Sequence, residues 1–329
     1  MKKILVIQTA FLGDAILATS LIEKLKSQFN EASIFYLVRK GNESLFYGHP
    51  HIQETLVWDK SENKYASLIG LLKKIRRLKF DLVVNVQRYA SSGILTVFSG
   101  AKTKVGFRDN PFSFLFDFKM MHQIGDGKHE IERNHTLISE LTDEVPALPK
   151  LYPSVSDYEL VSTYKNEKYY CIAPSSVWFT KQWPEEKWTE LTNLLYPYRV
   201  YVLGAKTEAA LSDRIAAAST NDNVVNLAGK LSLLQSAALL KDAEMNFVND
   251  SGPLHLSSAM NAPVTSVFCS TIKDFGFFPL SEKSYVVETK EKLSCRPCGL
   301  HGYKKCPEGH FKCGRSISAQ EVFRISYSS

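Results

Sequence analysis

The sequence predicts an α/β protein made of two Rossmann-like domains, each a doubly wound parallel sheet with helices on both faces. Strand-like and helix-like runs alternate along the whole chain, which is typical of parallel sheets. A length of 329 residues favours two domains. Three prolines within residues 145–153 disfavour both helix and central strand near the middle of the chain. We therefore expect domains at 1–152 and 153–329, with the last ~15 residues packing back on the first domain.

In the first half, short apolar runs predict strands at residues 4–9, 34–38, 55–58, 81–86 and 104–107. Between them, apolar residues at helical spacing predict helices at 14–29 and 67–78.

In the second half, the same signals predict strands at 169–173, 199–203, 224–227, 245–249, 264–269 and 285–287. Helices are expected at 184–195, 208–218, 231–240 and 253–260, the first of them starting at Pro184, a residue favoured in a first helical turn. Two such domains should face each other across a cleft, with ligands at the carboxyl ends of the strands.

The charge of the chain is unevenly distributed. Residues 1–155 carry 21 basic and 16 acidic groups, whereas residues 156–329 carry 19 and 18, so the first half favours an anionic partner. Cations flank the apolar face of the helix at 67–78, which suits contact with anionic lipid headgroups; a solvated polar face above an ordinary core stripe is the alternative. No apolar run reaches bilayer-spanning length, which favours a cytoplasmic protein that can sit on the inner membrane surface. The sequence contains no recognised nucleic-acid-binding module, which disfavours nucleic acid as a partner.

A phosphate-binding turn is predicted after the strand at 245–249. The sequence Asp-Ser-Gly-Pro-Leu-His follows this strand and opens a helix. Glycine allows close approach of the backbone, and the first N–H groups of a helix have no partner within it. The residues expected to hold a nucleotide-sugar here are Asp250, Ser251, Gly252, Pro253 and His255. An ordinary strand–turn–helix corner is the alternative.

Two further turns carry phosphate-type side chains. The segment 174–184 holds Ser175, Ser176, Thr180 and Lys181, whose hydroxyls and ammonium suit phosphate oxygens. At 203–208, Gly204 follows a strand and Glu208 suits a ribose diol, or alternatively the acidic first turn of a helix.

Asp14 is the candidate general base. It follows Gly13 at the carboxyl end of the first strand, where it faces the expected cleft or caps its own helix. The turn is not Gly-x-Gly-x-x-Gly, which weakens an oxidoreductase or epimerase with a dinucleotide cofactor as an alternative.

Cys295, Cys298, Cys306 and Cys313 lie within 19 residues. The first pair has metal-ligand spacing, and the second pair is more widely spaced than in a zinc ribbon. The sequence is therefore compatible with two interpretations of these cysteines: a structural metal site, or a reduced, partly buried cluster. Cys171 and Cys269 lie in strand-like runs and are expected in the core.

The segments 11–14, 181–184 and 250–255 together resemble glycosyltransferase family 9, the bacterial heptosyltransferases of lipopolysaccharide core assembly. Weaker similarities at 80–87, 104–108 and 226–230 extend the resemblance over nearly the whole chain, in order.

The resemblance implies a GT-B fold whose first domain binds the acceptor and whose second binds a nucleotide-sugar. It implies inverting transfer of a heptose from a donor such as ADP-heptose to a lipopolysaccharide core or related glycolipid acceptor, with no metal or cofactor required. Carried over by motif, Asp14 is the general base and Lys181 the phosphate-binding lysine. The acceptor-side residues are Gly13, Gln87 and Arg108. Some family members carry lysine where this chain has Gln8, which leaves the acceptor open.

A non-catalytic nucleotide-sugar-binding assembly protein of the same fold is the alternative function, although Asp14 and Lys181 argue against it.

Overall fold

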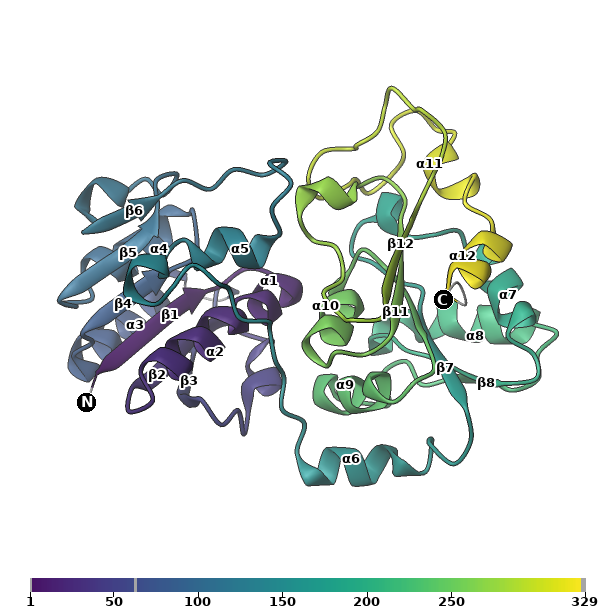
Figure 1. Cartoon of the computed structure of the whole chain (residues 1–329), viewed down its shortest axis with the longest axis horizontal. Helices are drawn as coiled ribbons and strands as arrows, with labels where there is room; N and C mark the ends of the chain where they lie inside the picture. Colours follow the sequence, from purple (N-terminus) through teal and green to yellow (C-terminus); the bar gives the residue numbers. More distant parts are fainter. Residues whose placement is uncertain (1, 62–63, 327–329) are drawn as a thin grey trace. The chain divides into compact units, whose positions relative to one another are not determined.

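The computed structural model of the chain describes residues 2–61 and 64–326 (Figure 1). The chain forms two compact units, Met1–Tyr152 and Pro153–Ser329, and each contains one six-stranded parallel sheet.

The sheet of the amino-terminal unit has the strand order β3-β2-β1-β4-β5-β6. Its strands are β1 (Lys3–Gln8), β2 (Ser33–Arg39), β3 (Ile52–Trp58), β4 (Leu82–Asn85), β5 (Thr103–Phe107) and β6 (Phe118–Met120). Its α-helices are α1 (Leu12–Leu17), α2 (Thr19–Gln28), α3 (Lys64–Leu78), α4 (Ala90–Val97) and α5 (Glu130–His135), with short 3₁₀ turns η1 (Glu43–Phe46), η2 (Ser113–Leu115) and η3 (Ser139–Leu141). Helices α3 and α4 pack together, as do α2 and α5.

This unit differs from the prediction in its first helix, in strand β6 and in α4, which was not predicted. The helix expected at 14–29 is divided at Ala18 into α1 and α2. Strand β6 was not predicted, because it has only three residues, two of them exposed, and so lacks a buried apolar pattern.

The sheet of the carboxy-terminal unit has the order β12-β11-β10-β7-β8-β9. Its strands are β7 (Tyr169–Ala173), β8 (Arg199–Val202), β9 (Val224–Asn226), β10 (Asn246–Asn249), β11 (Val264–Phe268) and β12 (Ser284–Glu288). Its α-helices are α6 (Val155–Ser162), α7 (Glu185–Leu194), α8 (Ala209–Ala218), α9 (Leu233–Lys241), α10 (Gly252–Ala259), α11 (Lys312–Arg315) and α12 (Ala319–Ile325), with turns η4 (Phe179–Lys181), η5 (Lys206–Glu208) and η6 (Lys273–Phe275). Helices α9 and α10 lie on one side of this sheet, and α7, α8 and α12 lie on the other (Figure 1).

Both sheets have the doubly wound topology that the sequence predicts. In each, the first three strands extend to one side and the fourth returns to pair with the first, so β1 neighbours β4 and β7 neighbours β10. Loops diverge at such a switch point and leave a crevice at the carboxyl ends of the strands, where ligands bind in open α/β sheets. The fold-class prediction is confirmed.

The carboxyl-terminal helix α12 packs against α7 and β11 within the second unit. The packing of the last residues on the first domain stays a prediction. Val322 and Ala319 of α12 are buried in the same cluster as Trp188, because they form the apolar face of this short helix. No helix in the described part of the chain is long and apolar enough to cross a membrane.

Candidate active site

A buried ion pair lies at the switch point of the carboxy-terminal sheet. Lys181 Nζ is 2.6 Å from Asp250 Oδ2, and the two side chains are only 14% and 6% exposed. Lys181 ends η4 after β7, and Asp250 directly follows β10, so the neighbouring strands β7 and β10 bring them together. Thr271, which follows β11, donates its hydroxyl to the same Asp250 oxygen at 2.7 Å. The structure thus places a cation where two of the turns that the sequence predicts to bind phosphate converge.

Asn249 fixes these two loops to each other. Its Oδ1 accepts a hydrogen bond from Trp183 N at 2.9 Å, and its Nδ2 donates to Pro174 O at 2.7 Å. Asn249 is fully buried, so both bonds are shielded from water. The loop after β7 therefore cannot move independently of the end of β10.

Ser251 occupies the N-cap position of α10, but its side chain does not form the capping hydrogen bond. Its hydroxyl instead lies 3.5 Å from Asn249 O, which it can donate to. Pro253 stands in the first turn of the helix and His255 is buried one turn in. The first-turn N–H groups of α10 are therefore not capped by Ser251 and suit an anion.

The other residues of the loop after β7 that were predicted to bind the nucleotide-sugar differ in burial. Ser175 and Ser176 are half-buried in the loop after β7. Thr180 is fully buried, and its hydroxyl oxygen accepts hydrogen bonds from Tyr303 N at 2.7 Å and Ser270 Oγ at 3.0 Å. This hydroxyl supports the surrounding loops.

Glu208 stabilises the turn after β8 by accepting a hydrogen bond from within that turn. Its Oε2 accepts a hydrogen bond from Ala205 N at 2.7 Å, and a Cβ atom at Gly204 would lie 2.8 Å from the same oxygen. Glycine at 204 therefore makes room for the carboxylate, which leaves Oε1 as the oxygen available to a ribose hydroxyl.

In the amino-terminal unit, Asp14 is the third residue of α1 and follows the carboxyl end of β1. It is half-buried, and Gly13 precedes it in the same turn. Burial raises the pKa of Tyr36 well above its usual value, and the nearby Asp14 charge raises it further. The phenol therefore stays protonated and donates to Ala15 O at 2.7 Å, which steadies the turn that carries Asp14.

Two buried carboxamides line the β1/β4 switch point. Gln87 Nε2 donates to Gln8 Oε1, which also accepts from Ala10 N at 3.2 Å. Asn110 holds the Gln87 loop by donating to Gln87 O at 3.0 Å. Within the described residues, Gln87 Oε1 is buried without a hydrogen-bond partner. A buried acceptor atom of this kind suits a ligand hydroxyl.

The structure also reveals a cation near this site. Lys60 Nζ donates to Thr9 O at 2.7 Å and to Thr9 Oγ1 at 3.2 Å, directly after β1. Arg108, predicted on the acceptor side, is exposed after β5 and lies 3.4 Å from Lys119 O through its Nε. A local pattern could not identify Lys60, because it reaches β1 from the far side of β2.

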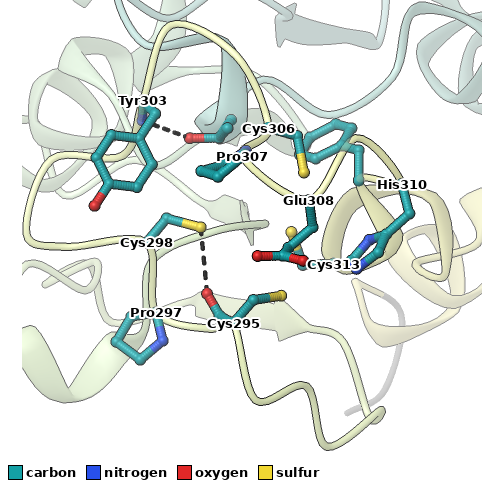
Figure 2. A pocket seen from close by; sticks show the side chains of 11 residues that line it. Cys295, Pro297, Cys298, Tyr303, Cys306, Pro307, Glu308, His310 and Cys313 are labelled. Atoms are coloured by element: carbon teal, nitrogen blue, oxygen red, sulfur yellow. Dashed lines mark hydrogen bonds between the residues drawn. The ribbon is translucent and has the colours of Figure 1, made fainter.

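The four clustered cysteines line one pocket of about 210 Å³ (Figure 2). All are free thiols, and Cys298 Sγ donates to Cys295 O at 3.4 Å. Burial raises the pKa of Cys313 to about 11 and also raises that of Cys298, with the neighbouring sulfurs adding to the effect. Among the described residues, no three His, Cys, Asp or Glu side chains are placed closely enough to hold a metal ion. Cys171 and Cys269 are fully buried in the core, as expected.

Residues 68–305 match the family model of glycosyltransferase family 9 (heptosyltransferase). The chain belongs to this family. The expected resemblance and the assignment as a glycosyltransferase are therefore confirmed.

Solved structures have the same fold as this glycosyltransferase family 9 chain. The E. coli ADP-heptose lps heptosyltransferase II structure superposes with a TM-score of 0.81 at 21% identity, covering 98% of this chain and 97% of that one. A family 9 glycosyltransferase from Veillonella parvula gives a TM-score of 0.87 at 19% identity over 99% and 96%. In sequence, the lipopolysaccharide core heptosyltransferase OpsX of Haemophilus influenzae is 24% identical over 280 residues, which are 81% of this chain and 79% of the relative.

Proposed function

We propose that this protein transfers a heptose from a nucleotide-diphosphate donor, ADP-heptose, to a lipopolysaccharide core or related glycolipid acceptor. Membership of the heptosyltransferase family supports the reaction class. Curated relatives named lipopolysaccharide heptosyltransferases support the acceptor, and E. coli WaaC has been solved with ADP and with ADP-2-deoxy-2-fluoro heptose. The observation that carries the proposal is the cation Lys181 held at the β7/β10 switch point, where α10 begins.

On the donor side, Lys181 and the first-turn amides of α10 hold the diphosphate. When the bond between the anomeric carbon and the diphosphate breaks, negative charge develops on the leaving phosphate. Fixed donors aimed at that charge commonly supply the largest share of catalysis. Asp250 and Thr271 hold the lysine in place beforehand, so little reorganisation accompanies the step. In this proposal the charge is stabilised by the chain itself, and turnover is expected not to depend on added Mg²⁺ or Mn²⁺.

On the acceptor side, Asp14 is the general base. Its carboxylate takes the proton of the acceptor hydroxyl as that oxygen bonds to the anomeric carbon and the nucleoside diphosphate leaves. One displacement of this kind inverts the configuration at that carbon. General-base catalysis typically contributes about 10²–10⁴-fold. In this proposal the first unit binds the acceptor and the second binds the donor.

The acceptor subsite is assigned to Gly13, Gln87 and Arg108, with Gln8 beside them. The two carboxamides are neutral, and the buried Gln87 Oε1 suits a sugar hydroxyl. Arg108 offers an exposed cation for an anionic substituent of the acceptor.

Two substitutions test the two halves of this mechanism. Asp14→Asn should lower kcat by about 10²–10⁴-fold and leave ADP affinity unchanged, because it removes a base but no donor contact. Lys181→Ala should weaken ADP binding about 10- to 100-fold in calorimetry, because a charge-assisted hydrogen bond is lost. Glu43→Gln in η1 is the matched acid control and should change neither quantity.

Loss of binding and turnover together in Asp14→Asn would contradict the base role. Unchanged ADP affinity in Lys181→Ala would contradict the donor site. Binding of ADP-heptose by the wild type without transfer to any glycolipid would favour a non-catalytic assembly protein.

We also propose that helix α3 contacts the membrane surface that carries the acceptor. Tyr65 and Ile69 are 75% and 55% exposed, and Lys73 and Arg77 continue the same helical face. Aromatic and aliphatic groups beside cations suit an anionic lipid interface. A double variant that carries both Lys73→Glu and Arg77→Glu should no longer co-sediment with anionic vesicles, as the wild type does. The control Lys168→Glu, an exposed lysine of the other unit, should not affect it; equal binding by all three proteins would refute this contact.

A further inference from the structure

The short segment that follows β11 supports the donor site through two hydroxyl groups. The Thr271 hydroxyl donates to Asp250 Oδ2 at 2.7 Å, and the same oxygen is the ion-pair partner of Lys181. The Ser270 hydroxyl donates to Thr180 Oγ1 at 3.0 Å, and Thr180 directly precedes the lysine in the chain. Both hydroxyl residues are fully buried, so these bonds are shielded from water. The position of the proposed phosphate-binding lysine therefore depends on this segment.

The backbone of the same segment is bound by the loop between β12 and α11. The guanidinium of Arg296 donates through Nε to Cys269 O at 2.7 Å. Its Nη2 donates to Thr271 O at 2.6 Å and to Phe268 O at 3.1 Å. The carbonyl oxygen of residue 270 accepts a hydrogen bond from Cys298 N at 2.9 Å. All four carbonyl oxygens of residues 268–271 are thus held by one turn, which fixes the position of the segment.

A carboxylate holds the guanidinium in this place. Glu288, the last residue of β12, accepts a hydrogen bond from Arg296 Nη2 at 2.8 Å, and the two side chains are 24% and 12% exposed. The same Glu288 oxygen accepts a bond from Lys273 N at 3.1 Å. Arginine presents its donors in a rigid planar fork, which the single ammonium of lysine cannot reproduce. The three carbonyl contacts therefore require an arginine and not only a positive charge.

We propose that Arg296 is a positioning residue of the donor site, which holds residues 268–271 and, through Thr271 and Asp250, keeps Lys181 directed at the diphosphate. This role rests on the donor site proposed above. Thr271 and Lys181 share one oxygen of Asp250, so a displacement of Thr271 changes how that oxygen holds the ammonium. A cation fixed in advance stabilises phosphate charge without reorganisation. Loss of Arg296 should therefore weaken the binding of the diphosphate and leave the nucleoside contacts unchanged.

Two ligands that differ only in the diphosphate test this role. Calorimetry of Arg296→Lys should show ADP binding about tenfold weaker than in the wild type, the size of one hydrogen bond to a charged group. Its affinity for adenosine, which carries no phosphate, should equal that of the wild type. Arg199→Lys is the matched control and should bind both ligands as the wild type does. Arg199 begins β8 at the opposite end of the sheet and pairs through Nε with Glu167 at 3.1 Å.

A double-mutant cycle tests whether the effect passes through the lysine. Adding Arg296→Lys to Lys181→Ala should weaken ADP binding no further, because no ammonium is left to be directed. A further tenfold loss in that background would overturn the proposal. Equal losses of ADP and adenosine affinity in Arg296→Lys would overturn it as well, because a general structural defect affects both ligands.

Thr271→Val provides the same measurement without changing the arginine, and so covers the case in which Arg296→Lys does not fold. Valine keeps the shape of threonine and removes the hydroxyl that donates to Asp250. ADP binding should again weaken about tenfold, with adenosine binding unchanged. Wild-type ADP affinity in Thr271→Val or Arg296→Lys, beside weakened binding in Lys181→Ala, would overturn the positioning role alone. Wild-type ADP affinity in Lys181→Ala would contradict the donor site itself.

Discussion

The Lys181–Asp250 pair offers a quantitative test of the donor site, with Lys181→Met as the perturbation. Methionine keeps most of the side-chain length and removes the charge. Asp250 is then left as a carboxylate that is 6% exposed, with the Thr271 hydroxyl as a remaining partner. Removing one partner of a buried ion pair typically costs about 3–5 kcal/mol, because the other charge stays buried and uncompensated.

This loss in the free energy of unfolding should lower the melting temperature measurably. The carboxy-terminal unit spans residues 153–329, which is 177 residues. For a domain of this size, 1 kcal/mol lowers the melting temperature by about 2–4 °C, so a loss of about 3 kcal/mol predicts a fall of about 6–12 °C. Differential scanning calorimetry of the wild type and the variant measures it.

Two further variants separate this explanation from a general loss of packing. Lys181→Met combined with Asp250→Asn should recover most of the loss, since no unpaired charge stays buried. Arg214→Met removes an exposed ion pair with Glu185 and should leave the melting temperature unchanged. The reasoning is refuted if Lys181→Met behaves like Arg214→Met, or if the double variant recovers nothing.

The remaining predictions concern the amino-terminal unit. Burial, helped by the neighbouring His51, lowers the pKa of His49 to about 4, although Glu23 Oε1 lies 3.6 Å from its Nε2 and favours the charged ring. The unfolded chain therefore takes up this proton first, and stability is lost as pH falls from about 6.5 towards 4, by up to about 3 kcal/mol. Urea unfolding should show this slope in the wild type and a flatter one in His49→Gln; equal slopes would contradict it. Gly93→Ala in α4 should cost about 1–3 kcal/mol, because its Cβ would collide with Asn110 Oδ1. Gly70→Ala on exposed α3, with no atom within 4 Å, should instead stabilise by about 0.5–1 kcal/mol, and similar effects at both positions would contradict the steric argument.

Much of the fold could be predicted because its signals are local. The apolar run at 169–173 coincides with β7, and Pro184 marks the start of α7. Strand β6 was missed because a short exposed strand at the edge of a sheet needs no apolar side chains. The partners of α12 within its unit could not be predicted, because the apolar face of a short helix can pack against any core and the sequence does not specify which one.

Among the site residues, too, those in local motifs could be predicted and those brought in from distant segments could not. Asp250 and Lys181 were named from the turns that carry them, because strand, turn and helix signals act locally. Thr271 and Lys60 were missed, because each reaches its partner from a segment that is distant in sequence.

The amino-acid sequence by itself determined the alternation of strands and helices, the family and the residue types at each strand end, since periodicity, turn chemistry and short motifs act over a few residues. Only the tertiary structure decided that Lys181 pairs with Asp250. This contact joins segments 69 residues apart, and it exists because the order of strands in the sheet, which no local pattern encodes, places the ends of β7 and β10 side by side.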